Sequence, residues 1–588
     1  MNTLEHLKTC KTLHDLAVLL GYKTKALSFI LYSKPIHSQY EIFTIPKKNG
    51  GLRTIHSPKK DLKELQKKLA AILNDCFNII ELERLTTSSY IKCIISHGFR
   101  QKLTVELPVN KNNRKKLKTF DLNLGIYSNA KRHINRKYVL NIDLKDFFHS
   151  ITFRRIVGYF CKNDHFKLDK NISILISQIC TYRDPNLTEG YLPQGSPCSP
   201  IISNFIGGIL DNRLNNFAQE NKCSYSRFAD DITFSTNMKF FPKNIAFEEN
   251  EKYILGKPLR KIIKNSHFFI NDKKTRLTTH QNKQEVTGLV VNKKVNISNN
   301  YNQYTRSMVH SFCSTGSFSR SKYHVNSNLV TINSLNGILN HVFNIKFPLY
   351  KPNVKLRNFD DLQGVEKLLI QFSFHKEFIF NEKPHIICEG VTDPLHLKYA
   401  YKQLHSTNNY PFKFSSLEEI HIFSKILGLG NGTPNMIKFL NMYHKIKKSK
   451  ANSANACIFF VDGDNDGKSV ITNTLKKFKN YEKIDFANYK NSIDLLETYH
   501  LEENLYIVQL PKEEMIENLY PQSILNIQLG SRAYNGSNDK FDKKQFYGKI
   551  EFINEIIKNP NNKVDFSKFY IVFDTLAHIQ IHNYLKNI

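Results

Sequence analysis

The sequence predicts an α+β chain in two successive parts, the second of which is an α/β domain with a small parallel sheet. At 588 residues the chain is too long for one hydrophobic core, so two to four domains are expected. Helical spacings and hairpin signals are mixed in the first part, whereas strands alternate with helices from about residue 383. Such alternation is typical of a parallel sheet.

A helix and a hairpin open the chain. The apolar positions of the helix are Leu13, Leu16, Ala17 and Leu20, and Gly21 provides a stop. A hairpin is predicted over 43–55, because Asn49-Gly50 forms turns that need positive φ. A helix should follow over about 61–73.

A basic insertion lies at about 103–127. Its cationic residues are Lys111, Arg114, Lys115, Lys116 and Lys118. A solvated loop is the simpler interpretation of such a charge run, and an arm that contacts nucleic acid is the more specific interpretation.

Three carboxylates carry the chemistry of the first part. Asp230 and Asp231 are adjacent in an apolar, β-branched run, and Asp143 ends a similar run upstream. Neighbouring acids repel each other and resist burial unless a cation lies beside them. A solvated turn would explain one isolated pair. Three acids at strand ends instead favour a two-Mg²⁺ site that activates a 3′ hydroxyl and neutralises pyrophosphate, as in a nucleic-acid polymerase.

The motifs around these acids occur in the order found in reverse transcriptases. Lys145-Asp146-Phe147-Phe148 follows the first acid, and the rigid loop 192–200 leads into an apolar helix at 201–214. Gly288-Leu289-Val290-Val291 follows the acid pair. Phe228-Ala229-Asp230-Asp231 resembles the Tyr-x-Asp-Asp box of that family, with phenylalanine in place of tyrosine. The resemblance implies a right-hand polymerase with fingers and palm over 1–300 and a thumb over 301–350.

The resemblance also implies residue roles. Asp143 and Asp230 would hold both Mg²⁺ ions, Asp231 would support them, and the Leu144 carbonyl would complete one coordination shell. Phe148 would be the steric gate against a ribonucleotide 2′ hydroxyl. The residues implied to bind nucleotide are Arg53, Phe148, Gln194 and Gly195.

Two further strings resemble signatures of retron reverse transcriptases. They are Asn129-Ala130-x-x-His133, before the first acid, and Val286-Thr287-Gly288, after the palm. The resemblance implies that Asn129, His133, Val286, Thr287 and Gly288 contact RNA.

A second acidic constellation follows two later strands. Glu389 and Gly390 end a short strand that begins at His385, and Asp462-Gly463-Asp464 follows the apolar strand 457–461. An EF-hand is excluded, because Asn473 stands where its last loop position needs glutamate. Thr433 likewise breaks the G-x-G-x-x-G pattern of a dinucleotide loop.

This constellation resembles the TOPRIM domain of topoisomerases, primases and OLD-type nucleases. The resemblance implies that Asp462 and Asp464 bind one or two Mg²⁺ ions, while Glu389 completes the site or moves protons. Glu517 and Lys549 resemble accessory residues of the OLD-type branch. The implied boundaries are a linker at 351–382 and a TOPRIM domain at 383–588.

Composition favours a polyanionic partner. The formal net charge is +32, from 84 Lys and Arg against 52 Asp and Glu, and nucleic acid is the expected partner. A membrane surface is the alternative, but no run of 18 apolar residues provides an anchor. The ten cysteines form no Cys-x-x-Cys motif, and no signal-peptide pattern opens the chain, so a bacterial cytoplasmic location is expected.

The function predicted from these resemblances is a retron RNA-directed DNA polymerase. It would copy a structured non-coding RNA, using dNTPs, into a short branched RNA-linked DNA (msDNA), with a fused TOPRIM effector acting in defence against phage. Two alternatives stay open. The TOPRIM part is either a metal-dependent nuclease regulated by the bound RNA–DNA product or an inert binding module. The sequence leaves oligomerisation undetermined.

Overall fold

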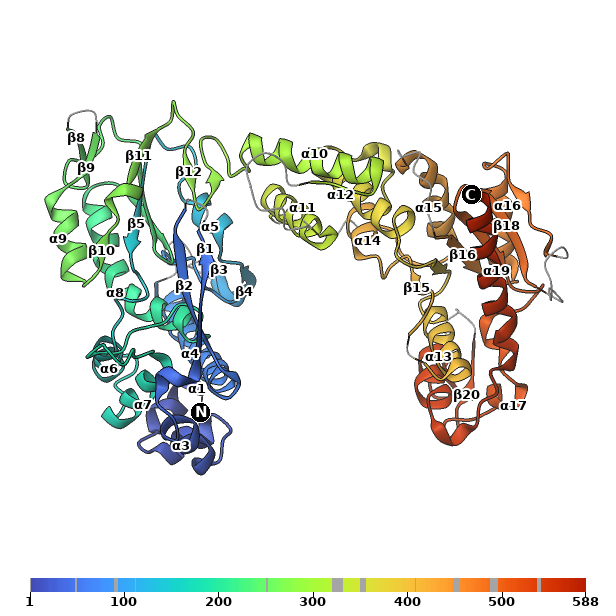
Figure 1. Ribbon diagram of the computed structural model, residues 1–588, viewed down its shortest axis with the longest axis horizontal. Coiled ribbons are helices and arrows are strands. Elements are labelled where there is room, and N and C mark those ends of the chain that lie inside the picture. The colour runs from blue at the N-terminus through green and yellow to red at the C-terminus, as the bar shows by residue number, and fades with distance from the viewer. Residues whose placement is uncertain are drawn as a thin grey trace. The chain divides into compact units, whose positions relative to one another are not determined.

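The structure is a computed structural model that divides into two compact units, Met1–Ser298 and Asn299–Ile588 (Figure 1). It describes residues 2–47, 50–88, 94–110, 113–249, 252–319, 331–348, 356–407, 409–447, 455–486, 495–536 and 541–587. Each unit is described by itself.

Unit 1 begins with helices and a hairpin. These elements are α1 Thr3–Thr9, α2 Leu13–Leu19, α3 Thr24–Tyr32, β1 Tyr40–Pro46, β2 Leu52–Pro58 and α4 Lys60–Ser88. Helix α2 and the β1–β2 hairpin confirm the predicted elements, and Gly21 has a φ of +67° directly after the α2 cap. Helix α4 is longer than predicted, because buried apolar residues continue along it as far as Leu85.

The basic insertion forms a hairpin rather than a loop. Strands β3 Leu103–Asn110 and β4 Asn113–Leu122 pair antiparallel, with Leu103 opposite Leu122. Apolar residues at 103, 105 and 107 have the two-residue period of a strand, which the charge run masked in the sequence.

An antiparallel sheet forms the centre of unit 1. Its described strands are β5 Tyr138–Lys145, β6 Ser224–Phe228, β7 Asp231–Thr236, β10 Phe269–Ile270 and β11 Arg276–Thr279. They follow the order β10-β5-β7-β6, with β11 also paired to β5. Along β5, Leu140, Ile142 and Leu144 are buried in the core. Because side chains alternate, Asp143 lies on the opposite face.

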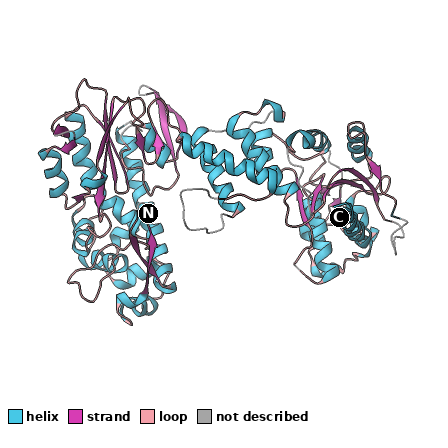
Figure 2. Cartoon of the chain, turned by 45° about the horizontal axis from the view of Figure 1, so that its top comes forward, coloured by secondary structure: helices cyan, strands magenta, loops and turns pink. Residues whose placement is uncertain are grey.

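Helices and small hairpins surround this sheet (Figure 2). The remaining described helices and strands of unit 1 are α5 Ile126–Lys131, α6 Phe153–Lys162, α7 Lys170–Cys180, α8 Ser199–Glu220, β8 Ala246–Glu249, β9 Lys252–Leu255, α9 Lys257–Asn265, β12 Glu285–Val286 and β13 Leu289–Val290. Helix α8 contains the predicted helix 201–214 and packs against β6, while α9 packs against β10. The loop 192–200 runs directly into α8.

Unit 2 begins with a group of packed helices. They are α10 Asn299–Thr315, α11 Ile332–Lys346 and α12 Gly364–Phe374, followed by a π-helical turn His375–Ile379. Each pair among the three helices is in contact, and the Phe312 ring lies 5.2 Å from the Phe372 ring. The segment 351–382, predicted as a linker, therefore contains packed helix in its described part, where Phe372, Phe374 and Phe378 are fully buried.

The rest of unit 2 is built on a sheet of six described strands. They are β14 His385–Cys388, β15 Lys413–Ser416, β16 Cys457–Val461, β17 Glu482–Lys483, β18 Glu497–Glu502 and β19 Leu505–Gln509. Their order is β15-β14-β16-β19-β18-β17. The strands β15, β14, β16 and β19 are parallel, which confirms the predicted small parallel sheet. Strand β18 is antiparallel to β19, and β17 is antiparallel to β18.

Helices and short strands complete unit 2. Its other described helices and strands are α13 Asp393–His405, α14 His421–Leu427, α15 Thr433–Ile446, α16 Asn465–Leu475, α17 Gln522–Leu525, β20 Ala533–Tyr534, β21 Phe546–Tyr547, α18 Lys549–Glu551 and α19 Tyr570–Asn587. None of the helices in the described ranges has the length and apolar character needed to span a bilayer.

Candidate active sites

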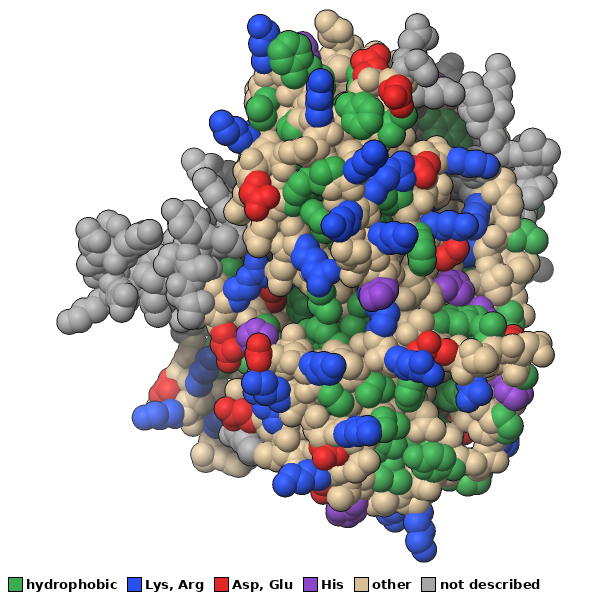
Figure 3. Space-filling model, turned by 90° about the vertical axis from the view of Figure 1, so that its left-hand side faces the viewer, with side chains coloured by type: hydrophobic (Ala, Val, Ile, Leu, Met, Phe, Trp, Pro, Cys, Tyr) green, Lys and Arg blue, Asp and Glu red, His purple; other side chains and the backbone are tan. Residues whose placement is uncertain are grey.

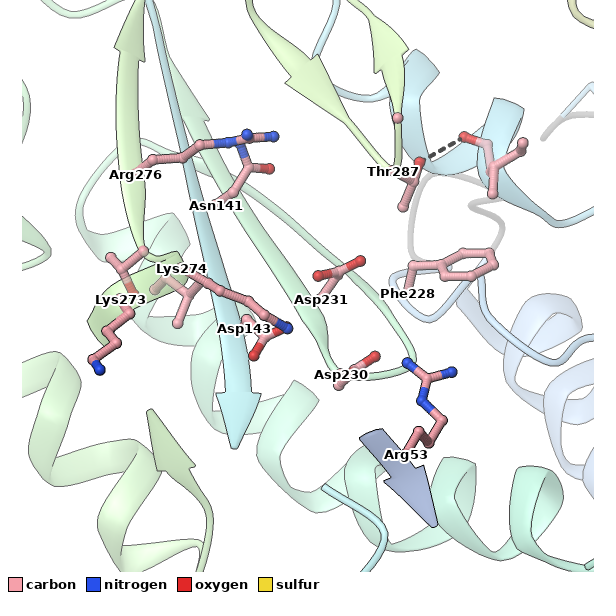
Figure 4. A pocket seen from close by; sticks show the side chains of 14 residues that line it. Arg53, Asn141, Asp143, Phe228, Asp230, Asp231, Lys273, Lys274, Arg276 and Thr287 are labelled. Carbon is pink, nitrogen blue, oxygen red and sulfur yellow. Dashed lines mark hydrogen bonds and ion pairs between the residues drawn. The ribbon is translucent and has the colours of Figure 1, made fainter. Parts of the chain in front are cut away.

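The three predicted carboxylates of unit 1 line one cavity of about 670 Å³ (Figure 4). Strands β6 and β7 are joined by a two-residue turn, Ala229-Asp230, and Asp231 begins β7. Asp143 on β5 is the register partner of Asp231. The sheet register therefore brings together acids that are 88 residues apart in the sequence.

Burial and like charge raise the pKa of the two adjacent acids of this cavity, Asp230 and Asp231. Partial burial, together with the charges of Asp230 and Asp143, raises the pKa of Asp231 to about 6. Burial and the Asp143 charge also raise the pKa of Asp230, while Lys274 and Arg53 oppose that shift. A site that raises the pKa of its carboxyls favours a bound cation.

Sequence analysis missed two polar partners of Asp143. Lys274 Nζ lies 2.8 Å from Asp143 Oδ1, and Asn271 Nδ2 donates to Asp143 Oδ2 at 2.9 Å. Both residues lie between β10 and β11, and these two strands pair with successive parts of β5. In the sequence Lys274 gave only a weak signal of a functional role, because one lysine in a basic chain is not distinctive until the fold places it beside an acid.

The predicted nucleotide-binding residues lie close to this cavity. Arg53 on β2 lines it, on the side of Asp230 (Figure 4). Gln194 accepts a hydrogen bond through its backbone carbonyl from His56 N at 2.7 Å. Gly195 has a φ of +115°, and an added Cβ would lie 2.8 Å from His56 O. The 192–200 loop is therefore seated directly against the strand that carries Arg53.

Neither Phe148 nor Leu144 is among the residues that line this cavity. The half-buried Phe148 ring lies 6.1 Å from the Phe99 ring and 5.5 Å from the Phe147 ring, and it is not among the residues that line the cavity. The Leu144 side chain is buried, and its backbone N–H donates to Asp230 O at 3.0 Å. The contact ties the acidic turn to β5.

His133 and Asn129, both predicted to contact RNA, are buried instead, and so is Val286. His133 is fully buried between Ser226 Oγ and Ser235 Oγ, each 2.7 Å from a ring nitrogen. Burial holds its pKa well below the ordinary value, so the ring is neutral. Asn129 is also fully buried. The expectation of direct RNA contact is therefore corrected for both residues, since neither side chain reaches the surface in this conformation.

The Val286-Thr287-Gly288 string forms the tip of the β12–β13 hairpin. Val286 is buried, whereas Thr287 and Gly288 line the cavity. Both turn residues have positive φ, +48° and +78°, a strained conformation for a β-branched threonine. Thr287 Oγ1 donates to Ile126 O at 3.3 Å.

The acids of unit 2 gather at the carboxyl ends of adjacent parallel strands. Glu389 follows β14, whereas Asp462 and Asp464 follow β16, and all three line a cavity of about 1120 Å³. Thr433 Oγ1 donates to Glu389 Oε1 at 2.5 Å, and Ile516 N donates to Asp462 Oδ1 at 3.3 Å. Asp464 caps helix α16 by accepting from Gly467 N at 2.8 Å.

A fourth acid, Asp393, was missed in the sequence. It is buried at the start of α13, accepts a hydrogen bond from Gly390 N at 2.7 Å and lines the same cavity. Burial and the charges of Asp393, Glu517 and Glu389 raise the pKa of Asp462 to about 8. One signal in the sequence could have identified Asp393. It is the spacing Glu389-x-x-x-Asp393, which follows the end of a strand and runs into the start of a helix.

The two accessory residues of this site form an ion pair. Lys549 Nζ lies 3.2 Å from Glu517 Oε1, and the Glu517 side chain is only 3% exposed. Burial excludes an ordinary surface position for Glu517. Lys549 lines the cavity and is within electrostatic reach of Asp462.

Both acid groups suit Mg²⁺ in donor type and charge. Each contains a carboxyl group, Asp231 in one and Asp462 in the other, whose pKa is raised by burial and like charge, which a divalent cation would relieve. Among the described residues, no three His, Cys, Asp or Glu side chains are already drawn together at coordinating geometry.

Comparisons with known proteins identify the first half of the chain. Residues 45–291 match the family model described as reverse transcriptase (RNA-dependent DNA polymerase). The chain is 30% identical to the retron Ec86 reverse transcriptase of Escherichia coli over 316 residues, which is 53% of this chain and 81% of that protein. It is 27% identical to the retron Mx65 reverse transcriptase of Myxococcus xanthus over 339 residues, 55% of this chain and 69% of that protein.

Solved structures add no argument about the fold. A telomerase structure from Candida albicans, in complex with a fragment of telomeric RNA, matches at 11% identity with a TM-score of only 0.28. That match covers 69% of this chain and 64% of the other. The family assignment rests on the sequence matches, which agree with the acids, the sheet register and the cavity of unit 1. The chain belongs to the retron reverse transcriptase family.

Proposed function

We propose that this reverse transcriptase copies a structured non-coding RNA into a short branched RNA-linked DNA, using the cavity of unit 1. The observation that carries the proposal is the register pairing of Asp143 with Asp231 beside the Asp230 turn. It gives three carboxylates on one wall, with Arg53 on the hairpin side of the same cavity. The names of the retron relatives support the RNA-linked product.

The residues of unit 1 would have separate roles in nucleotide transfer. Two Mg²⁺ ions would lower the pKa of the primer hydroxyl and neutralise the departing pyrophosphate. Asp143, Asp230 and Asp231 would hold them, and Arg53 would orient the triphosphate by charge-assisted hydrogen bonds. Gln194 and the backbone at Gly195 would support the base pair being formed, because their loop is fixed against β2.

RNA binding is supported by the surface charge of unit 1. Figure 3 shows more Lys and Arg than Asp and Glu side chains over the face that it presents. Helix α9 adds exposed Lys257, Lys261 and Lys264 on one helical face. Cations spread in this way bind phosphate without reading sequence, which suits a folded RNA.

Primer extension on an RNA template with Mg²⁺ tests the polymerase site. Asp230→Asn and Asp231→Asn should each abolish synthesis while leaving the fold intact, because a neutral amide cannot hold the cations. Asp272→Asn is the matched control, since Asp272 is an exposed partner of Arg260 and should retain full activity. Wild-type synthesis by both site variants would refute the assignment.

For unit 2 we propose a TOPRIM effector that cleaves phosphodiesters with Mg²⁺ or Mn²⁺ and acts in defence against phage. The gathering of Glu389, Asp393, Asp462 and Asp464 at one sheet edge supports it, since four acids there are costly without a cation. The bound RNA–DNA product would restrain cleavage until a phage disturbs it. An inert binding module is the second candidate, and it would explain the fold but not the buried acids.

Phage challenge separates the two candidates. Cells carrying wild type, Glu389→Ala or Asp462→Ala would be compared for plaque formation, with DNA synthesis measured in parallel. Glu482→Ala, which removes an exposed partner of Lys586, is the control. Loss of protection with DNA synthesis retained supports an active effector. Protection retained by both site variants would favour the binding module.

A further inference from the structure

A fully buried arginine lies directly beneath the acidic turn of unit 1. Arg227 on β6 donates through Nε to Asp211 Oδ1 at 2.8 Å and through Nη2 to Asp211 Oδ2 at 2.7 Å. Its side chain has no exposed surface, and that of Asp211 on α8 is 4% exposed. The Tyr225 hydroxyl donates to the same carboxylate at 2.7 Å. A buried two-point ion pair of this kind has a fixed geometry.

The arginine also holds the turn itself. Arg227 Nη1 donates to the Ala229 carbonyl at 3.0 Å, and Leu144 N donates to the next carbonyl, that of Asp230. Ala229 has a φ of +56° at the first of two turn residues, a place where glycine is usual. Both carbonyls of a strained turn are therefore fixed by donors from outside it.

Close packing leaves the arginine and the turn little freedom. An added Cβ on Gly207 would lie 2.7 Å from the Arg227 guanidinium carbon, and one on Gly98 would lie 2.6 Å from Ala229 N. Arg227 Nη2 also donates to Ser96 Oγ at 3.3 Å. Lysine could not replace these contacts, because one ammonium group cannot reach both Asp211 oxygens and the Ala229 carbonyl in the same plane.

We propose that Arg227, anchored by Asp211, is a positioning residue that holds the Ala229-Asp230 turn so that Asp230 and Asp231 point at the metal-binding cavity. It acts through the backbone of the turn and touches neither substrate nor metal. The inference rests on the proposed assignment of these two acids as metal ligands. It predicts that loosening the arginine weakens metal binding even when the fold survives.

The test compares Arg227→Lys with Tyr225→Phe. Both side chains are buried on β6 and donate to the same Asp211 carboxylate, but only Arg227 reaches the turn. The full-length variants would carry Glu389→Ala and Asp462→Ala as well, so that the second site does not contribute to metal binding. Three quantities are measured: the thermal midpoint, the Kd for Mn²⁺ by electron paramagnetic resonance, and the Mg²⁺ concentration that gives half-maximal primer extension.

Arg227→Lys should weaken Mn²⁺ binding and raise the Mg²⁺ requirement by roughly ten-fold or more. Tyr225→Phe should lower the thermal midpoint but change both metal readouts less than two-fold. Equal metal readouts in the two variants would overturn the proposal. If Arg227→Lys does not fold, Asp211→Asn takes its place, and wild-type Mn²⁺ affinity in that variant would overturn it. Absence of Mn²⁺ binding by the parent would instead refute the proposed polymerase site.

Discussion

Metal binding at the unit 2 site should release a proton from Asp462. With a pKa of about 8, this carboxyl is about nine-tenths protonated at pH 7 in the metal-free protein. A cation binds only the ionised form, so each ion bound should expel about 0.9 proton from Asp462 at pH 7 and about 0.1 at pH 9. Below pH 8 the affinity should fall by up to about ten-fold for each pH unit.

Isothermal titration of Mn²⁺ in buffers of different ionisation enthalpy measures that release. The protein would carry Asp230→Asn and Asp231→Asn, so that only the unit 2 site binds. Adding Asp462→Asn to this parent should abolish the Asp462 contribution and weaken binding. If Mn²⁺ binds to the parent but fewer than about 0.2 protons leave at pH 7, Asp462 is ionised without metal and the reasoning from burial fails.

Three further predictions concern unit 1. Phe148→Ala should raise the ratio of ribo- to deoxynucleotide incorporation by about one order of magnitude, measured by primer extension, whereas an unchanged ratio would make Phe148 a packing residue only. Gly195→Ala should destabilise unit 1 by about 2–4 kcal/mol in thermal unfolding, because its φ of +115° is strained for alanine and the new Cβ meets His56 O at 2.8 Å. Gly208→Ala, with open space around the site, is its control. RNA that copurifies with the protein should bind at least about ten-fold more weakly at 200 mM than at 50 mM salt, and a flat salt response would exclude phosphate contacts as the main source of affinity.

Local patterns predicted much of the fold. The Asn-Gly turn and its flanking residues identified the β1–β2 hairpin, and the apolar strands of unit 2 identified a parallel sheet. These elements are predictable because turn chemistry and periodicity act over a few residues. The β3–β4 hairpin was less visible, since the run of cationic residues in β4 resembles a solvated loop. The packing of α12 against α10 depends on contacts distant in sequence.

The residues of the candidate sites were likewise predictable where the signal is local and were missed where it depends on tertiary contacts. Asp143, Asp230 and Asp231 were predicted as one group, because adjacent acids in apolar runs are rare and strand ends converge in a sheet. Lys274 gave no comparable signal, since it acquires its partner Asp143 only from the tertiary structure. Asp393 was overlooked, although its hydrogen bond with Gly390 is local. His133 shows the opposite error, in which a short signature string suggested surface contact while the histidine joins two serines inside the sheet.

The packing of α12 has a practical consequence for experiments that separate the two halves of the chain. A truncation near residue 350 would keep α10 and α11 but remove α12, leaving the Phe312 ring without its neighbours Phe372 and Phe380. The shortened protein would present a newly exposed aromatic surface and would be prone to aggregate. Loss of DNA synthesis in such a fragment would then report damaged packing rather than dependence on the second domain. Point variants in the intact chain are the sounder way to ask what each half does.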